Sequence, residues 1–328
     1  MPNFHLNYAL YLHDYIAKCY KMYYSCVMRK KKGSHIKRCI IVINKLSGNG
    51  NRADERTLKT ALGAGYAVDY YYIVEKQKLE DFSEYDRIVV CGGDGTLNGI
   101  LNSKIRDDVE IIYMPYGTLN EFYNGGIKNN HFLKDICFAN DLYFSYVMAA
   151  GIFTPIGYCV NDKKKRKYKA LAYIAHVVKE YKIHRIKAKI SASDFKDEGE
   201  YTLIMAIDSP RCFGFRFNRL FKADDGIMHL LTIKAPKTNG IFGKIKIFFP
   251  LFRAFFVGFG KPYHSKNMEF RPFDKLTISL DKDVDFDMDG EKKVLGGDVN
   301  LGITCFSRPI TIMSKSDLKN LYDANNAH

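Results

Sequence analysis

Tryptophan is absent from this 328-residue sequence, and its eight cysteines form no CxxC pair. The cysteines are scattered along the chain, at positions 19, 26, 39, 91, 137, 159, 212 and 305. The absence of tryptophan alone excludes no function. Because several cysteines lie inside apolar runs, we expect reduced thiols in the core of a cytosolic protein, not a disulfide framework.

The sequence also lacks an uncharged apolar run of the ~18 residues that a transmembrane helix needs. Its first apolar region is followed by the basic residues 29–32, whereas a signal peptide carries its basic residues first. We therefore expect a soluble or peripheral protein. Its predicted location is the cytoplasm, as a peripheral protein at the inner face of the membrane. Positive charge, in contrast, is abundant: the formal net charge is +14, which favours an anionic partner such as a nucleotide, a nucleic acid or an acidic membrane surface.

Hydrophobic residues make up 47% of the chain, enough for the cores of two domains. Residues 88–91 form a short apolar run typical of a buried strand, and the glycine-rich residues 92–95 follow it. Leu97, Ile100, Leu101 and Ile105 then recur at helical spacing. A glycine-rich link into a helix start suits phosphate, because backbone N–H groups there are unpaired.

Asp94 stands inside this loop, where a carboxylate would repel phosphate unless a cation or a donor lies between them. We expect it, at an exposed loop, to face the Mg²⁺ of a bound nucleotide or to accept a hydrogen bond from a hydroxyl; the alternative is an ordinary helix N-cap. Two further loops, residues 44–50 and 115–122, also follow predicted strands. Loops at the carboxyl ends of parallel strands converge on one ligand in doubly wound sheets.

Three motifs, NxxSGxG at 44–50, GGDGT at 92–96 and PxGTxN with an acidic residue and Phe at 115–122, together resemble the diacylglycerol kinase catalytic-domain family, in its soluble bacterial lipid kinase branch. The resemblance implies an ATP-dependent lipid kinase that phosphorylates a lipid alcohol such as diacylglycerol or a sphingoid or ceramide-type lipid. It assigns nucleotide contacts to Asn44, Ser47, Gly48, Gly92, Gly93, Asp94, Gly95, Thr96, Gly117, Thr118 and Asn120.

The resemblance also implies a fold class: a doubly wound α/β nucleotide-binding domain and a C-terminal β-sandwich domain, preceded here by an extra N-terminal helix. We predict a basic amphipathic helix over 1–35, the ATP-binding domain over 36–142 and the lipid-substrate domain over 143–305. Residues 306–328 are expected to return to the first domain. Alternating patterns at 186–191, 201–207 and 228–233 support strands in the second domain.

Acidic residues are assigned by the same resemblance. Asp289 and Glu291 match an Asp-Gly-Glu motif. The resemblance implies that one of the two is the catalytic base, without indicating which, and that it acts with Asp94 and Glu121. A structural Mg²⁺ would be held by the Asp225 carboxylate and the carbonyl oxygens of Lys222 and Ile227; the alternative is a solvated turn. Glu121 stands where the family has Asp, and Val74 stands where it has Thr.

Two apolar segments leave their roles open. Residues 4–28 are either a helix lying on an anionic membrane or one packed on the core or on a homodimer partner. Residues 241–260 are either a core helix or a hydrophobic rim facing lipid.

Other function classes fit less well. GxxxxGK[ST], GxGxxG and the protein kinase HRD and DFG motifs are absent. An NAD kinase-like enzyme shares GGDGT but differs in its later motifs. A non-catalytic membrane or nucleic-acid binder on a decayed kinase scaffold would use the basic clusters at 29–32 and 163–167. Retention of Asp94, Asp289 and Glu291 together favours the enzyme, and no nucleic-acid partner is expected.

Overall fold

The computed structural model describes residues 36–75, 79, 81–118, 120–124, 132–152, 183–212 and 214–326, without the side chains of 306–308. The helix predicted over residues 1–35 and the basic cluster at 163–167 lie outside the described residues. Residues Arg38–His328 form one unit by their contacts, and the description below concerns that unit.

The first half is built on a parallel sheet. Its strands are β1 (Arg38–Asn44), β2 (Ala67–Ile73), β3 (Arg87–Gly92) and β4 (Glu110–Pro115), in the spatial order β2-β1-β3-β4. Strands β1, β3 and β4 are buried on both faces, and the edge strand β2 is partly exposed. Along β3 the side chains alternate between two cores: Ile88 and Val90 join one cluster, and Val89 joins the other. The apolar run predicted as a buried strand is therefore confirmed.

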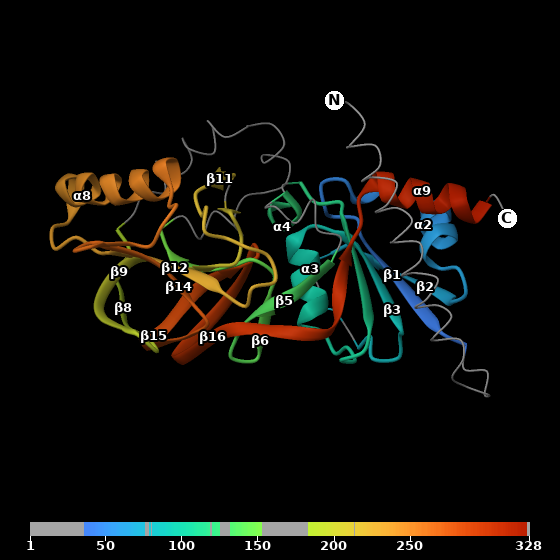
Figure 1. Ribbon diagram of the computed structural model, residues 1–328, viewed down its shortest axis with the longest axis horizontal. Helices are drawn as coiled ribbons and strands as arrows, with labels where there is room; N and C mark the ends of the chain where they lie inside the picture. The colour runs from blue at the N-terminus through green and yellow to red at the C-terminus, as the bar shows by residue number, and fades with distance from the viewer. Residues whose placement is uncertain are drawn as a thin grey trace, which may run out of the picture. The chain divides into compact units, whose positions relative to one another are not determined.

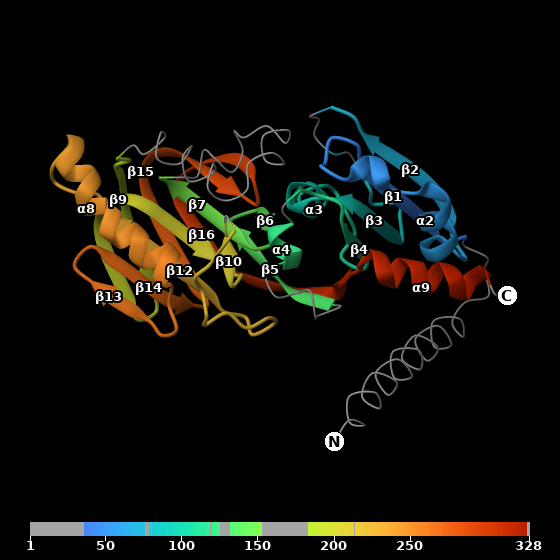
Figure 2. The same ribbon diagram turned by 90° about the horizontal axis from the view of Figure 1, so that it is seen from above.

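Helices cover both faces of this sheet. Helix α2 (Glu55–Leu62) has Asp54 as its N-cap, and the side chain of this residue accepts a hydrogen bond from the Thr57 backbone N–H. It lies beside α9 (Lys315–Asn326) on one face, as Figures 1 and 2 show. Helix α3 (Asp94–Leu101) packs on the opposite face. It ends before Ile105, so the helical pattern predicted to include that residue is one turn too long.

The second half consists mainly of antiparallel strands, in keeping with the predicted fold class. They are β5 (Phe132–Ala139), β6 (Leu142–Phe144), β7 (Val147–Gly151), β8 (Ile186–Ala192), β9 (Phe195–Ile207), β10 (Arg211–Cys212), β11 (Phe215–Arg216), β12 (Met228–Lys234), β13 (Tyr263–Ser265), β14 (Met268–Phe273), β15 (Lys275–Met288) and β16 (Glu291–Ile312). The last of these, β16, is one continuous strand of 22 residues.

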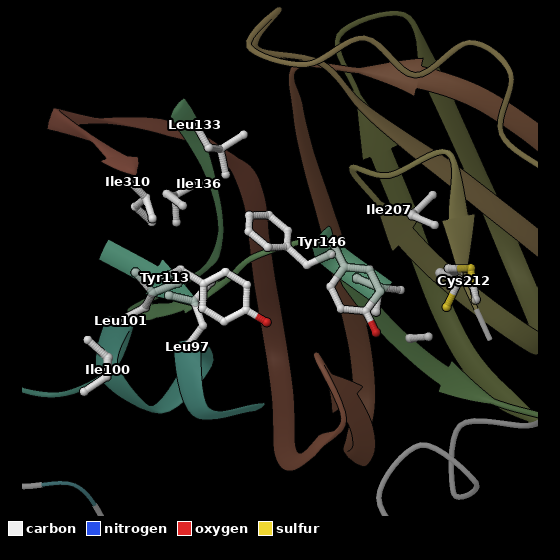
Figure 3. Close-up of a cluster of buried hydrophobic side chains, with 14 of the residues drawn as sticks. Leu97, Ile100, Leu101, Tyr113, Leu133, Ile136, Tyr146, Ile207, Cys212 and Ile310 are labelled. Atoms are coloured by element: carbon white, nitrogen blue, oxygen red, sulfur yellow. The ribbon is translucent and has the colours of Figure 1, made fainter. Parts of the chain in front are cut away.

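Strand β16 joins the two halves. Its first part pairs antiparallel with β15, and its end pairs parallel with β4 through Thr311 and Ile112. One core cluster continues across the junction, from Leu97 and Tyr113 of the first half to Tyr146 and Ile207 of the second (Figure 3). Side chains from both halves are therefore held in fixed register around that junction.

The apolar segment at 241–260 contains α8 (Gly240–Phe252) and a π-helical turn (Arg253–Val257). Figure 1 shows α8 lying over the strands of the second half. Across the described ranges, none of the helices has both the length and the apolar character needed to cross a bilayer.

Candidate functional site

The three predicted loops meet at the point where the parallel sheet reverses its winding. Strand β2 lies on one side of β1, whereas β3 and β4 lie on the other. In sheets of this kind ligands bind outside the carboxyl ends of the two strands at that reversal. The loops after β1 and β3 leave from those ends, and the loop after β4 joins them: Asn49 N–H donates to Tyr116 O at 2.8 Å, and Tyr116 N–H to Gly92 O at 2.7 Å.

Glycines allow the loops to touch. A Cβ added at Gly117 would lie 2.6 Å from the Gly93 Cα atom, and one added at Gly48 would lie 2.2 Å from Thr118 Oγ1. Such distances are too short for real Cβ atoms, so glycine is favoured at both Gly117 and Gly48. Their common feature is loop-to-loop contact, which brings the three segments of the predicted nucleotide site into one surface.

Asn44, Ser47 and Thr96 fix the first loop against the second. Asn44 Nδ2 donates to Thr96 Oγ1 at 2.8 Å, and its Oδ1 accepts from Leu46 N at 2.9 Å. Ser47 Oγ donates to Asn44 O at 2.7 Å. These polar groups are occupied with holding the loops in shape.

Two buried polar atoms at the meeting point have no partner among the described residues: Thr118 Oγ1 and Asn120 Oδ1. Asn120 adopts a φ of 45°, and its Nδ2 donates to Pro115 O and Gly117 O. Buried polar groups in proteins are nearly always hydrogen-bonded. A ligand with oxygen atoms and hydroxyl groups, such as a nucleotide, fits these two atoms.

Asp94 is buried at the start of α3, which corrects the expectation that it lies on an exposed loop. Its Oδ2 accepts from Glu121 N at 2.7 Å, and its Oδ1 from the Tyr113 hydroxyl at 3.1 Å. The carboxylate thus caps α4 (Glu121–Asn124). Burial, and then the charge of Asp289, raise the pKa of Asp94 to about 7.

Asp289 is buried and surrounded by donors. It occupies the turn between β15 and β16 with a φ of 54°. Its Oδ2 accepts from Ser145 N at 2.5 Å, Ser145 Oγ at 3.0 Å and Asn98 Nδ2 at 3.2 Å; its Oδ1 accepts from Tyr146 N at 3.1 Å and Val147 N at 3.2 Å. Burial raises the pKa of Asp289, and these hydrogen bonds act against the rise. The arrangement ties the turn to β7 and α3.

Glu291 follows two residues later and is exposed. Its side chain lies over the glycine of the second loop, since a Cβ added at Gly95 would be 2.9 Å from Glu291 Oε1. The second half of the chain therefore brings a solvent-accessible carboxylate directly to the start of α3. The structure thus separates the two acidic residues of the Asp-Gly-Glu motif by environment.

Glu121 is only 3% exposed and is paired with Arg211, a residue that the sequence analysis missed. Arg211 Nε donates to Glu121 Oε2 at 2.8 Å, and Nη2 to Oε1 at 3.5 Å. Burial raises the pKa of Glu121, and the Arg211 charge opposes this. Ninety positions separate the partners in the chain, and no local pattern marks Arg211.

Removal of this cation should destabilise the protein. Arg211→Met leaves a buried carboxylate without its counter-charge, and we expect the free energy of unfolding to fall by about 2 kcal/mol at neutral pH. The deficit should shrink on acidification, because protonation removes the uncompensated charge. Urea unfolding at several pH values measures it. The matched control is Arg216→Met, an exposed arginine paired opposite Arg211 in the same hairpin; equal losses in both variants would contradict the prediction.

The turn predicted to hold a structural Mg²⁺ lies away from these loops, beside β5. Asp225 Oδ1 accepts from Ile227 N at 3.1 Å, within the turn itself. Asp224 Oδ1 accepts from Lys134 N at 2.8 Å, and Gly226 N donates to Asp135 Oδ2 at 2.6 Å. Across the residues that the structure describes, no group of three or more His, Cys, Asp or Glu side chains is placed to hold a metal. The set of Lys222, Asp225 and Ile227, which contains one carboxylate, stays a prediction.

Taken with the parallel sheet, these features define the class of the first half: an α/β domain with three polar loops at its topological switch point. The family described as "Diacylglycerol kinase catalytic domain" matches residues 38–132. The resemblance predicted from the three motifs is therefore confirmed for residues 38–132, which are similar to this catalytic domain.

Several similar sequences and solved structures also carry the names of lipid or diacylglycerol kinases. A "Putative lipid kinase" of Streptococcus pneumoniae is 24% identical over 287 residues, which span 78% of this chain and 92% of that protein. A "Diacylglycerol kinase" of Staphylococcus epidermidis is 30% identical over 165 residues, 42% of this chain and 51% of that one. A solved structure of a "putative diacylglycerol kinase" from Bacillus anthracis has a TM-score of 0.59 at 18% identity, covering 86% of this chain and 99% of that one. The structural match shows a shared fold.

Proposed function

We propose that this protein is an ATP-dependent lipid kinase, which transfers the γ-phosphoryl group of ATP to the hydroxyl of a membrane lipid such as diacylglycerol or a sphingoid-type lipid. One observation carries the proposal: three loops at the switch point of the sheet, with two unpartnered buried polar atoms, meet a carboxylate contributed by the second half of the chain. The relationship to lipid kinases supports the class of reaction.

ATP would lie against the three loops. The proposed contacts are backbone N–H groups of the glycine loops and the side-chain oxygens of Thr118 and Asn120. Asp94 would hold Mg²⁺, because its acidic surroundings, with Asp289 and Glu121 nearby, favour a cation. When bound, the ion would neutralise charge on the transferring phosphoryl group.

Glu291 is our candidate for the catalytic base, and Asp289 for a positioning residue. Five hydrogen bonds already occupy the Asp289 oxygens, and the residue is buried. Glu291 is exposed and reaches the start of α3. In the proposed reaction the acceptor oxygen bonds to the γ-phosphorus, the bond to the β–γ bridging oxygen breaks, ADP leaves and Glu291 takes the hydroxyl proton.

Arg211 has a role in this proposal as well. Its guanidinium is held by Glu121 and is 28% exposed at the side chain, so it can present a positive charge beside the loops. The acceptor lipid resides in a bilayer, so the enzyme would work at an anionic membrane surface, consistent with the net charge of +14.

The test is transfer of radiolabelled phosphate from ATP to a panel of lipid alcohols in mixed detergent micelles, resolved by thin-layer chromatography. NAD is included as an acceptor. We expect a labelled lipid that needs added Mg²⁺, and no labelled NAD. Labelled NAD without labelled lipid would replace the proposal with an NAD kinase, and no labelled product from correctly folded protein would refute a kinase.

A further inference from the structure

Helix α8 and the π-helical turn after it have two apolar faces, of which one is packed on the protein. The inner face joins the core cluster that contains Leu231 and Ile233 of β12. It consists of Ile247, Leu251, Ala254 and Phe255, all buried. The outer face consists of Ile241, Phe242, Ile245, Phe248, Phe249, Phe252, Phe256 and Val257, which are 46% to 71% exposed. The two readings of this segment, core helix and apolar rim, thus apply to opposite faces of one element.

The outer face is continuous. The rings of Phe248 and Phe252 stack with centroids 5.9 Å apart, and those of Phe252 and Phe256 with centroids 5.1 Å apart. Steps of four residues keep these rings on one side of the helix. Contiguous exposed apolar surface of this kind marks an interaction site in folded proteins.

The segment that carries this face has charge of one sign in its sequence, and one of its lysines, Lys234, is paired with Asp197 of β9. Residues 226–268 contain no Asp or Glu and seven basic residues, at positions 234, 237, 244, 246, 253, 261 and 266. Lys244 and Lys246 are exposed on α8 itself. Arg219 is fixed at the far end, where its Nη2 donates to Val257 O at 2.9 Å. The apolar face is therefore flanked by cations at both ends.

These observations favour an anionic lipid surface over a second copy of the chain. A two-fold dimer through this face would bring the same cations together, and residues 226–268 contain no Asp or Glu to compensate them. Anionic headgroups attract Lys and Arg, and the acyl boundary accepts phenylalanine rings. The helix is too short to span a bilayer and contains Pro250, so it would lie in the interface plane.

We propose that α8 and its π-helical turn form an interfacial docking element, which lays its outer phenylalanine face into the headgroup boundary of an anionic bilayer. The inference rests on the proposed function, because it states how the enzyme reaches an acceptor that stays in the bilayer. It also assigns membrane contact to this helix in the second half, independently of residues 1–35.

The lack of tryptophan provides a direct test. Phe252→Trp gives a protein with a single tryptophan on the outer face, and Phe132→Trp places one on β5 at nearly the same exposure, 45% against 46%. Vesicles of phosphatidylcholine containing phosphatidylglycerol should shift the emission of Phe252→Trp to shorter wavelength, and brominated acyl chains should quench it. Phe132→Trp should show neither effect, and pure phosphatidylcholine should give a weaker response.

A second pair of variants measures binding. Phe248→Ser combined with Phe249→Ser should lower co-sedimentation with the anionic vesicles by roughly tenfold or more, since two large apolar side chains no longer enter the interface. Phe132→Ser should bind like the unaltered protein. Because the altered side chains are exposed, circular dichroism should confirm an unchanged fold.

Three results would overturn the inference. The first is that the emission of Phe252→Trp does not respond to anionic vesicles, and the second is that the double serine variant binds them undiminished. The third is a blue shift without lipid that accompanies doubling of the molecular mass, which would assign the face to a second copy of the chain. None of these measurements uses ATP. The micelle kinase assay on the unaltered protein tests the proposed function separately, because micelles supply acceptor without a bilayer.

Discussion

An Asp94→Asn variant is expected to lose most phosphoryl transfer and yet to be more stable than the unaltered protein at neutral pH, when nucleotide and Mg²⁺ are absent. The loss of activity follows from the proposal that this carboxylate holds the cation. The gain in stability follows from its burial next to Asp289, where a negative charge is costly.

The pH dependence has a definite sign. The pKa of Asp94 is about 7 in the folded protein, against a usual value of 3.8. Between these values the folded state binds a proton that the unfolded state has lost, so the free energy of unfolding falls as pH rises through this window. A shift of this size corresponds to a few kcal/mol, about 1.4 for each pKa unit. Asparagine removes the slope, and the Tyr113 hydroxyl can reorient to accept from its amide.

Urea unfolding in the presence of chelator, from acidic to mildly alkaline pH, measures the stability effect. Asp81→Asn is the control: Lys104 and Ser83 lower the pKa of this exposed carboxyl to about 2, so its titration affects stability only at lower pH. The micelle assay measures transfer. A variant that unfolds with the same pH slope as the unaltered protein would contradict the buried-charge account, and normal transfer would contradict the cation assignment.

Local patterns predicted much of the first half, because parallel strands buried on both faces are continuous apolar runs. The apolar run 88–91 predicts a strand for this reason, and the predicted glycine-rich link into a helix is confirmed, with Gly93 between β3 and α3. The predicted helix after this link is too long because it includes Ile105. This residue is apolar for another reason, since it packs against the core from outside α3. Spacing alone does not distinguish these two situations.

The sequence does not indicate how buried each site residue is or which side chains surround it. Asp94 was expected to be exposed because glycine-rich loops generally are, but its carboxylate is enclosed by Tyr113 and the start of α4. The Glu121 pair with Arg211 depends on a contact between distant segments. In the second half, α8 is apolar on both faces, and only tertiary packing decides which of them is buried.

Separate substitutions of the two carboxylates in the Asp-Gly-Glu motif should have opposite consequences. Glu291→Gln is expected to lower the rate of phosphoryl transfer ~10²- to 10⁴-fold, the usual range for loss of a general base. Its stability should change by no more than about 0.5 kcal/mol, because Glu291 is exposed. Affinity for ATP should be preserved, since the three loops that would bind ATP are in the first half.

Asp289→Asn should act mainly on stability. The two carboxylate oxygens accept hydrogen bonds from Ser145, Tyr146, Val147 and Asn98. An amide has only one accepting oxygen and would point its N–H donors toward other donors. A buried donor without a partner costs ~1–3 kcal/mol, so we expect a loss on the order of 3 kcal/mol. Activity should fall in proportion to the folded fraction and to misplacement of Glu291.

Single-turnover transfer, nucleotide affinity and urea unfolding, measured on both variants, separate a base from an anchor. Glu198→Gln, at an exposed glutamate of β9 that pairs with Lys189, is the control for loss of a surface charge. The pH–rate profile adds a readout that a purely structural role would not change: Glu291→Gln should lose the acidic limb, and Asp289→Asn should keep it. A stable Asp289→Asn protein without that limb, beside an active Glu291→Gln protein, would reverse the two roles.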